Sequence, residues 1–260
     1  MITTIERDDD PRLGGYRHVG DPQWLEANGL FVAEGRLVVE RLIDLPGIVV
    51  ESVLVTAAAH RALEARLSDD LTVYLAPQTV LNAVTGFNFH RGCLALARRP
   101  PQPPLSELGN ARCVVVLEGV NNPDNVGGIF RSAAALGAGG VILDPTSGDP
   151  FYRKAIRTSM GAALSLPSVR FSTWPDDLAE LSKLGYVIAA LTPRGADTID
   201  SFVERVPAGA RVAWLAGAEG HGLTDGALAQ ADATVRIPID DRRDSLNVVV
   251  AVSIALHRIA

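Results

Sequence analysis

Short apolar runs alternate with segments of helical periodicity along most of the chain. Before residue 100, the runs LFVAEG, IVVESVLVT, LTVYLA and GCLALARR predict strands, and the segments RLVVERLIDL, AAAHRALEARL and PQTVLNAVTG predict helices. After residue 112, the runs CVVVLE, GGVILD, YVIAAL, VAWLAG and ATVRIPI predict a second set of strands. The helices expected between and after these strands span 127–137, 151–162, 175–184, 222–230 and 245–259.

This alternation indicates an α/β protein with two domains. Strands separated by helices of about 10–15 residues are typical of a largely parallel sheet flanked by helices, which we expect for residues 112–260. Residues 25–99 predict a smaller α/β sandwich domain. Residues 100–111 begin with the proline-rich run PPQPP, which favours an extended linker between the two domains. Residues 1–24 are expected to be irregular.

Composition narrows the class of protein. Apolar residues make up 47% of the 260 residues and charged residues 21%, as in folded globular proteins. No apolar run approaches the roughly 20 residues that span a bilayer, and the first residues lack a secretion signal, so we expect a cytoplasmic protein. Cys93 and Cys113 lie in apolar runs without a further ligand at metal-binding spacing, and are expected to be buried free thiols. The net charge of −6 still allows a local basic surface.

Parallel sheets bind ligands at the carboxyl ends of their strands, so the segments that follow the strands are candidate sites. NNPDNVGGIFRSAAALGAGG follows CVVVLE. Here Asn125 is expected to cap the next helix, and Gly127 and Gly128 allow a ligand or another chain to approach the backbone closely. Arg131, inside that helix, lies within reach of the same place. Taken alone, this stretch is also explained by a capped helix with a surface arginine. The dinucleotide fingerprint G-x-G-x-x-G is absent, which disfavours a nucleotide-binding oxidoreductase.

Two later segments carry polar residues in comparable positions. AEGHGLTDGAL follows VAWLAG and holds Glu219 on a glycine-rich turn, either as a functional acid or as a solvated turn residue. DRRDSLNVVV follows TVRIPID and places Ser245 and Asn247 before the last helix, where Ser245 could simply be a helix cap. That helix is apolar on nearly every face, which predicts a subunit interface in addition to core packing.

A basic helix is predicted in DPFYRKAIRTSMGA, which carries Arg153, Lys154 and Arg157. Such a run is either a solvated face or a site that binds phosphate groups. The residues alone leave both interpretations open.

Together and in this order, these stretches resemble the SpoU (TrmH-like) branch of the SPOUT RNA methyltransferases. PDNVGGIFRSA is similar to the first motif of that family, LAGAEGHGL to the second and IPIDDRRDSLNVVVA to the third. RKAIRTSMGA is similar to a further family stretch, and residues 25–99 resemble the ribosomal-protein-like substrate-binding domain often found before the catalytic domain. Two positions depart from the family pattern: Asp241 stands where glycine is usual, and Val249 where serine is common.

The resemblance implies a specific fold and cofactor. The C-terminal domain would be a SPOUT α/β-knot with a deep trefoil knot, a rare exception to unknotted topology. It would bind S-adenosylmethionine, and no metal is expected. The residues that match the cofactor contacts of the family are Leu191, Thr192, Gly217, Gly222, Ile237, Ile239 and Leu246.

The resemblance also implies a reaction, which is methyl transfer to a ribose 2′-hydroxyl of RNA. The matching catalytic residues are Asn125, Arg131, Glu219, Ser245 and Asn247, and RNA contacts are expected from Arg131, Arg153, Lys154, Arg157, Arg36 and Arg91. The last helix would join two copies in a homodimer. The N-terminal domain favours ribosomal RNA (23S) as the substrate. The same reaction on tRNA, or a non-enzymatic role in RNA binding or ribosome assembly, remains an alternative.

Overall fold

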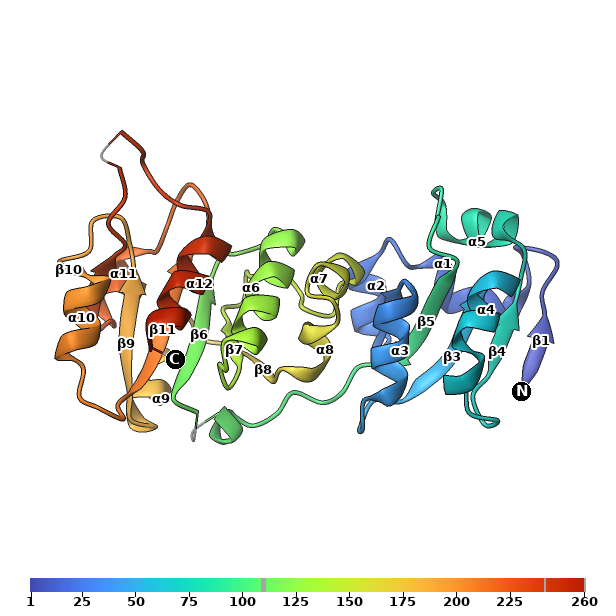
Figure 1. Ribbon diagram of the computed structural model, residues 1–260, viewed down its shortest axis with the longest axis horizontal. Coiled ribbons are helices and arrows are strands. Elements are labelled where there is room, and N and C mark those ends of the chain that lie inside the picture. The colour runs from blue at the N-terminus through green and yellow to red at the C-terminus, as the bar shows by residue number, and fades with distance from the viewer. Residues whose placement is uncertain (109–110, 241, 260) are drawn as a thin grey trace. The chain divides into compact units, whose positions relative to one another are not determined.

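Two separate β-sheets, one in each of two compact units, organise the chain (Figure 1). The computed structural model describes residues 1–108, 111–240 and 242–259. The first unit contains residues 1–101 and 151–165, and the second contains residues 102–150 and 166–260. Cys93 and Cys113 are buried free thiols, as predicted. Among the described residues, no helix has the length and apolar character needed to cross a membrane.

The first unit is built on a mixed five-stranded sheet in the order β1-β4-β3-β5-β2. Parallel pairing joins β1 to β4 and β4 to β3, and antiparallel pairing joins β3 to β5 and β5 to β2. Its elements are β1 (Ile2–Thr4), a 3-10 turn (Pro11–Leu13), α1 (Gly14–Arg17), α2 (Pro22–Ala27), β2 (Leu30–Glu34), α3 (Arg36–Asp44), β3 (Val50–Val55), α4 (Ala57–Leu63), a 3-10 turn (Glu64–Arg66), β4 (Val73–Leu75), α5 (Gln78–Thr85), β5 (Cys93–Arg98), α7 (Arg153–Thr158) and α8 (Ala162–Ser165).

Both faces of this first sheet are covered, which explains its strongly apolar strands. In β3, Leu54 packs into one core cluster while Val53 and Val55 pack into the other, as the alternation of side chains along a strand requires. The predicted α/β sandwich is therefore present.

The expectation that residues 1–24 are irregular is wrong. This segment contributes β1 at the edge of the sheet and places Leu13, Tyr16 and Val19 in one of the cores. The physical reason is that its scattered apolar residues are buried by contacts distant in sequence, which local periodicity does not reveal.

The second unit is built on a seven-stranded sheet in the order β10-β12-β9-β11-β6-β7-β8, in which every pairing is parallel. Its elements are a 3-10 turn (Leu105–Leu108), β6 (Cys113–Glu118), α6 (Pro123–Ala135), β7 (Val141–Leu143), β8 (Ser168–Arg170), α9 (Leu178–Lys183), β9 (Tyr186–Leu191), β10 (Asp197–Thr198), α10 (Ile199–Arg205), β11 (Arg211–Gly217), α11 (Asp225–Ala229), β12 (Ala233–Arg236) and α12 (Val248–Ile259).

Helices cover both faces of the second sheet, as the sequence predicts for a parallel sheet. Ala213 and Leu215 of β11 belong to the core cluster that also contains Leu178 and Leu181 of α9. Trp214, between them in sequence, makes an edge contact with Phe202 of α10 on the opposite face. All six residues of β6 are buried, as in a strand covered on both sides. The predicted linker is extended only at its start, because Leu108 is buried in the same core; residues 109 and 110 lie outside the described residues.

Residues 151–165 pack with the first unit, although the sequence places them within the C-terminal domain. Ile156 and Leu164 belong to a core cluster of the first sheet. The single helix expected over 151–162 is divided, because Met160 and Gly161 adopt left-handed backbone angles (φ 54° and 84°) between α7 and α8.

A buried carboxylate fixes α7 to the first sheet. Glu34, the last residue of β2, is 2% exposed. Its Oε2 accepts a hydrogen bond from Arg153 Nη1 (2.7 Å), and its Oε1 accepts one from Arg157 Nη1 (2.6 Å). The Arg153 guanidinium also lies 4.6 Å from the centre of the Phe87 ring. These contacts compensate the burial of the Glu34 charge.

We predict that Glu34→Gln lowers the free energy of unfolding by about 3–5 kcal/mol, because two guanidinium groups lose their charged partner in a buried setting. Urea unfolding followed by circular dichroism measures the change. The matched control is Glu51→Gln, which removes a surface pair with Arg98 (2.7 Å) and should cost less than about 1 kcal/mol. Equal effects of the two substitutions would contradict the role given to Glu34.

Candidate functional site

Three sequence motifs that lie far apart in the chain meet at Asn247 in the second unit. Asn247 Nδ2 donates to Asn125 Oδ1 (3.1 Å) across 122 positions of the sequence. The same nitrogen donates to Glu219 Oε1 (2.5 Å), 28 positions away. The first turn of α6, the turn after β11 and the residue before α12 are therefore joined in one polar cluster, which we call the Asn247 cluster (Asn125, Glu219 and Asn247).

Asn125 is the third residue of α6, so the prediction that it caps this helix is wrong. The helix begins at Pro123, and Asn122 caps it by accepting a hydrogen bond from Asp124 N (2.9 Å). Proline is favoured at the first helical position, which places the cap one residue before it. The Asn125 side chain is therefore not needed as a cap. It is buried and bonds to Asn247 instead.

Close packing of α6 on α12 sets the distance between Asn125 and Asn247. A Cβ atom on Gly128 would lie 2.9 Å from Val249 Cγ2, so glycine allows the two helices to approach. Ser253 Oγ and Ser132 Oγ form a hydrogen bond of 2.8 Å further along the same contact. The Val249 side chain thus fills the space above Gly128.

The turn after β11 has a backbone that only glycine allows at its start. A Cβ atom on Gly217 would lie 2.3 Å from the carbonyl carbon of Gly222, because the turn folds back on itself. Gly222 N donates to Ala218 O (3.0 Å) and closes this turn. Gly220 and Gly222 both have positive φ. The exposed Glu219 extends from this turn to Asn247.

The residues predicted to bind the cofactor lie along the edge of the parallel sheet that is formed by the carboxyl ends of its strands. Leu191 ends β9 and Thr192 follows it, Gly217 ends β11, and Ile237 and Ile239 follow β12. Leu246 lies just before α12, and Gly222 lies in the turn described above. The side chains of Leu191, Ile237, Ile239 and Leu246 are half-buried, so they offer apolar surface at this edge.

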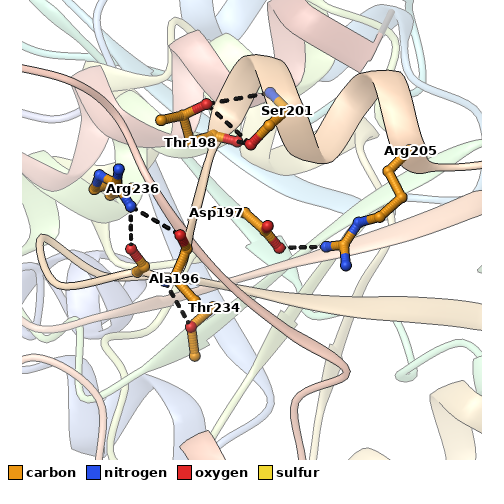
Figure 2. A network of polar contacts seen from close by, with 8 residues as sticks. Ala196, Asp197, Thr198, Ser201, Arg205, Thr234 and Arg236 are labelled. Atoms are coloured by element: carbon orange, nitrogen blue, oxygen red, sulfur yellow. Dashed lines mark hydrogen bonds and ion pairs between the residues drawn. The ribbon is translucent and has the colours of Figure 1, made fainter.

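A hydrogen-bond network holds the segment that follows β9 against β12 (Figure 2). Arg236 Nη1 donates to Gly195 O (2.6 Å) and to Ala196 O (2.9 Å), and Ala196 N donates to Thr234 Oγ1 (3.1 Å). A Cβ atom on Gly195 would lie 2.4 Å from Arg236 N, so this position requires glycine. The network fixes the backbone just after Leu191 and Thr192.

Two buried carboxylates at the ends of neighbouring strands organise this edge, and sequence reasoning missed both. Glu118 ends β6 and accepts hydrogen bonds from Thr224 and Trp174. Asp144, directly after β7, accepts from Gly119 N (3.0 Å) and Ser147 N (2.7 Å). The signal available in the sequence was a lone acidic residue at the end of each apolar run.

The side chains of Arg131 and Ser245 form no hydrogen bond with the Asn247 cluster. Arg131 is exposed on α6 and makes no hydrogen bond or ion pair within the part of the chain that the structure describes. The exposed Ser245 likewise has no side-chain hydrogen bond to any described residue, and Asn247 rather than Ser245 supports the start of α12, by accepting from Val249 N (2.9 Å). Asp241 lies outside the described residues.

The basic residues predicted to contact RNA lie in the first unit, apart from Arg131. Arg36, Arg91 and Arg157 line one cavity of about 240 Å³, together with Gly35 and the buried Glu34. Lys154 is half-buried and has no partner among the described residues. Arg153 is only 12% exposed and is bound to Glu34, so its environment is that of a structural arginine.

Comparisons with known proteins cover both units. Residues 112–257 match the model of the SpoU rRNA Methylase family. An uncharacterised tRNA/rRNA methyltransferase of Mycobacterium bovis is 40% identical, over 96% of this chain and 88% of that protein. The 23S rRNA (guanosine(2553)-2'-O)-methyltransferase RlmP of Bacillus subtilis is 27% identical, over 88% of each chain. The AdoMet-bound rRNA methyltransferase of Sinorhizobium meliloti has the same fold, with a TM-score of 0.84 at 24% identity, covering 99% of this chain and 97% of that one.

The pH dependence of stability tests how Asp144 holds the carboxyl ends of β6 and β7. Burial raises the pKa of its carboxyl group, but hydrogen bonds from Ser147, Thr146 and Gly119 together outweigh burial and hold the pKa below its ordinary value of 3.8. A carboxyl group with a lowered pKa stabilises the fold above that ordinary value, and the contribution is lost as the pH falls through the pKa of the folded state.

We therefore predict that Asp144→Asn lowers the free energy of unfolding by about 1.5–3 kcal/mol at pH 7. The difference from the wild type should narrow as the pH falls below about 4. Urea unfolding at a series of pH values between 7 and 3 measures it. A difference that stays constant over this range would show that the ionised carboxylate is not what stabilises the edge.

Proposed function

Because this chain belongs to the SpoU rRNA methylase family, we propose that it methylates the ribose 2′-hydroxyl of a ribosomal RNA. Family membership makes it an RNA methyltransferase that uses S-adenosylmethionine. The observation that carries the finer proposal is the Asn247 cluster, in which one residue from each of three family motifs is held in direct contact. The 2′-O position and ribosomal RNA are supported by RlmP of Bacillus subtilis, which is named for both.

The edge formed by β9, β11 and β12 fits S-adenosylmethionine. Half-buried Leu191, Ile237, Ile239 and Leu246 offer apolar contacts for an adenosine group. Gly217 leaves backbone accessible where any side chain would collide with the turn. When bound, the cofactor supplies an electrophilic methyl group on its sulfonium sulfur. Gly222 and Thr192 complete the set of residues that we assign to cofactor binding.

Arg131 is the residue that we assign to activation of the ribose hydroxyl. A 2′-hydroxyl is a poor nucleophile, and an oxyanion develops on it as its proton leaves. An arginine guanidinium keeps its own proton in proteins, so it is suited to stabilise this charge or the adjacent phosphate rather than to act as a base. Arg131 has no partner among the described residues, so its donors are available to a substrate.

The Asn247 cluster positions the reacting groups. Asn247 donates from its amide nitrogen to both Asn125 and Glu219, and its Oδ1 accepts from Val249 N, so its side chain is fixed at three points. A side chain held in this way loses little conformational entropy when substrate binds. Ser245, two residues earlier and exposed, is the hydroxyl that we assign to a direct hydrogen bond with the ribose or the phosphate.

The first unit supplies further contacts to the RNA backbone. Arg36 and Arg91 have exposed side chains on the cavity that Arg157 also lines, and Lys154 is available on α7. Together they form a local basic surface in an acidic protein, as phosphate contacts require. Arg153 is better explained as a partner of Glu34 than as an RNA contact. Dimerisation through α12 is proposed because its apolar residues Val249, Val250 and Ile254 are not fully buried.

The substrate is tested by comparing RNA from cells with and without this protein by 2′-O-methyl mapping. We expect one modified position of ribosomal RNA to lose its methyl group when the protein is absent. Loss confined to tRNA would favour the second candidate, which the tRNA/rRNA relative of Mycobacterium bovis leaves open. An unchanged map of both RNA classes would contradict methylation as the function.

We predict that Arg131→Ala lowers the single-turnover rate of methyl transfer by about 10²–10³-fold, as expected when one oxyanion donor is removed. The dissociation constant for S-adenosylmethionine, measured by calorimetry, should remain within about twofold, since Arg131 is not among the residues assigned to the cofactor. Lys183→Ala is the control, because it removes an exposed cation just before β9, at the opposite edge of the sheet. A rate for Arg131→Ala equal to that of the control would exclude the assigned role.

A further inference from the structure

We propose that Glu118 is a positioning residue for methyl transfer, which acts by anchoring the turn that carries Glu219. The proposal rests on the function proposed above, because the role of Glu219 belongs to it. Glu118 is not among the residues that the sequence motifs or the family resemblance single out. Its side chain forms no hydrogen bond with Asn125, Glu219 or Asn247 and acts only through the turn.

The Glu118 carboxyl group is buried and accepts three hydrogen bonds. It is 5% exposed at the end of β6. Its Oε2 accepts from Thr224 N (2.9 Å), and its Oε1 accepts from Thr224 Oγ1 (2.7 Å) and from Trp174 Nε1 (2.5 Å). Thr224 and Trp174 lie 106 and 56 positions away in the sequence, so the carboxyl group joins segments that have no local reason to meet. Charge-assisted bonds of this kind are among the stronger hydrogen bonds in proteins.

Both ends of the turn are fixed relative to Glu118. Gly217, where the turn begins, is the direct partner of Glu118 in the parallel pairing of β11 with β6. Thr224, where the turn ends, is held by the Glu118 carboxyl group. Thr224 also caps α11 by accepting from Ala227 N (3.2 Å), so its position is shared with the following helix. Glu118 is thus in contact with both ends of the turn and fixes the distance between them.

Inside the turn, Gly222 N donates to Ala218 O and Leu223 packs against the core, whereas the Glu118 carboxyl group holds the end of the turn at Thr224. Gly220 and Gly222 have positive φ, and a glycine-rich backbone has many accessible conformations when it is not anchored. Glu219 lies in the middle of this span and accepts from Asn247 Nδ2. Loss of the anchor at Thr224 would therefore spread Glu219 over several positions and weaken its contact with Asn247.

Glu118→Gln tests this arrangement with a side chain of nearly the same shape. Three donors face the carboxyl group, and an amide has one acceptor oxygen and one NH2 group that cannot accept. At least one donor of Thr224 or Trp174 must then face the NH2 group. The substitution should release the turn while leaving the pairing of β6 with β11 intact, since that pairing is made by the backbone.

The experiment is a double-mutant cycle of Glu118→Gln and Glu219→Gln in the full-length protein. Single-turnover methylation of RNA, calorimetry with S-adenosylmethionine and amide hydrogen exchange over residues 217–224 are the three readouts. We expect Glu118→Gln to lower the rate by about tenfold or more, to change the cofactor dissociation constant by less than about twofold, and to accelerate exchange in 218–224. In the Glu219→Gln background, Glu118→Gln should change the rate by less than about twofold, because its effect passes through Glu219.

Several results would overturn the proposal. Any one of three is enough: an unchanged methylation rate in Glu118→Gln, unchanged hydrogen exchange in the turn, or an equal loss of rate in the wild-type and Glu219→Gln backgrounds. If wild-type protein methylates no RNA, the proposed function fails, and exchange alone then decides whether Glu118 anchors the turn. Asp232→Asn is the control. It removes a carboxylate that accepts from a different backbone group, Ile188 N (2.8 Å). Hydrogen exchange in 218–224 should stay unchanged in this variant.

A second pair of variants serves if Glu118→Gln does not fold. Thr224→Ser keeps the hydroxyl that donates to Glu118 and caps α11, whereas Thr224→Ala removes it. We expect the serine variant to retain the rate and the slow exchange of the turn, and the alanine variant to lose both. Equal behaviour of the two variants would overturn the proposal.

Discussion

The parallel pairing of β6 with β11 is the constraint on which the site depends. The two strands are in register from Cys113 and Val212 to Glu118 and Gly217. Because parallel strands end at the same edge of a sheet, this register brings the start of α6 and the turn after β11 next to each other. A shift of one residue would move every side chain of β11 to the other face and separate Glu118 from Thr224. The backbone hydrogen bonds between β6 and β11 thus determine the position of the exposed Glu219.

Much of the architecture could be predicted from the sequence because it is encoded locally. Continuous apolar runs such as CVVVLE are what a strand buried on both faces requires, and β6 is such a strand. The rule that ligands bind at carboxyl ends of parallel strands directed attention to the segments that contain Asn125, Glu219 and Asn247, which are in contact. The trefoil knot stays a prediction, since spacing and periodicity carry no information on how a chain is threaded.

The features that sequence reasoning missed depend on partners distant in the chain. The helix after β6 starts earlier than predicted because Asn122 and Pro123 form a stronger start signal than Asn125. The residues alone left Arg153 and Arg157 either on a solvated face or in a phosphate-binding site, because Glu34, whose buried charge they neutralise, lies 119 and 123 positions away. Glu118 was overlooked for the same reason, because its partners lie 56 and 106 positions away.

The path of residues 151–165 has a consequence for modularity. The chain leaves the second unit after Pro150, completes a core of the first unit and returns at Leu166. The boundary between the units is therefore not a single point at which the chain could be cut. A fragment that starts at Gln102 would carry Ile156 and Leu164 without the core that buries them, and two arginines without their carboxylate. A graft of the second unit would therefore have to preserve both crossings of the chain and the surface of the first unit that receives residues 151–165.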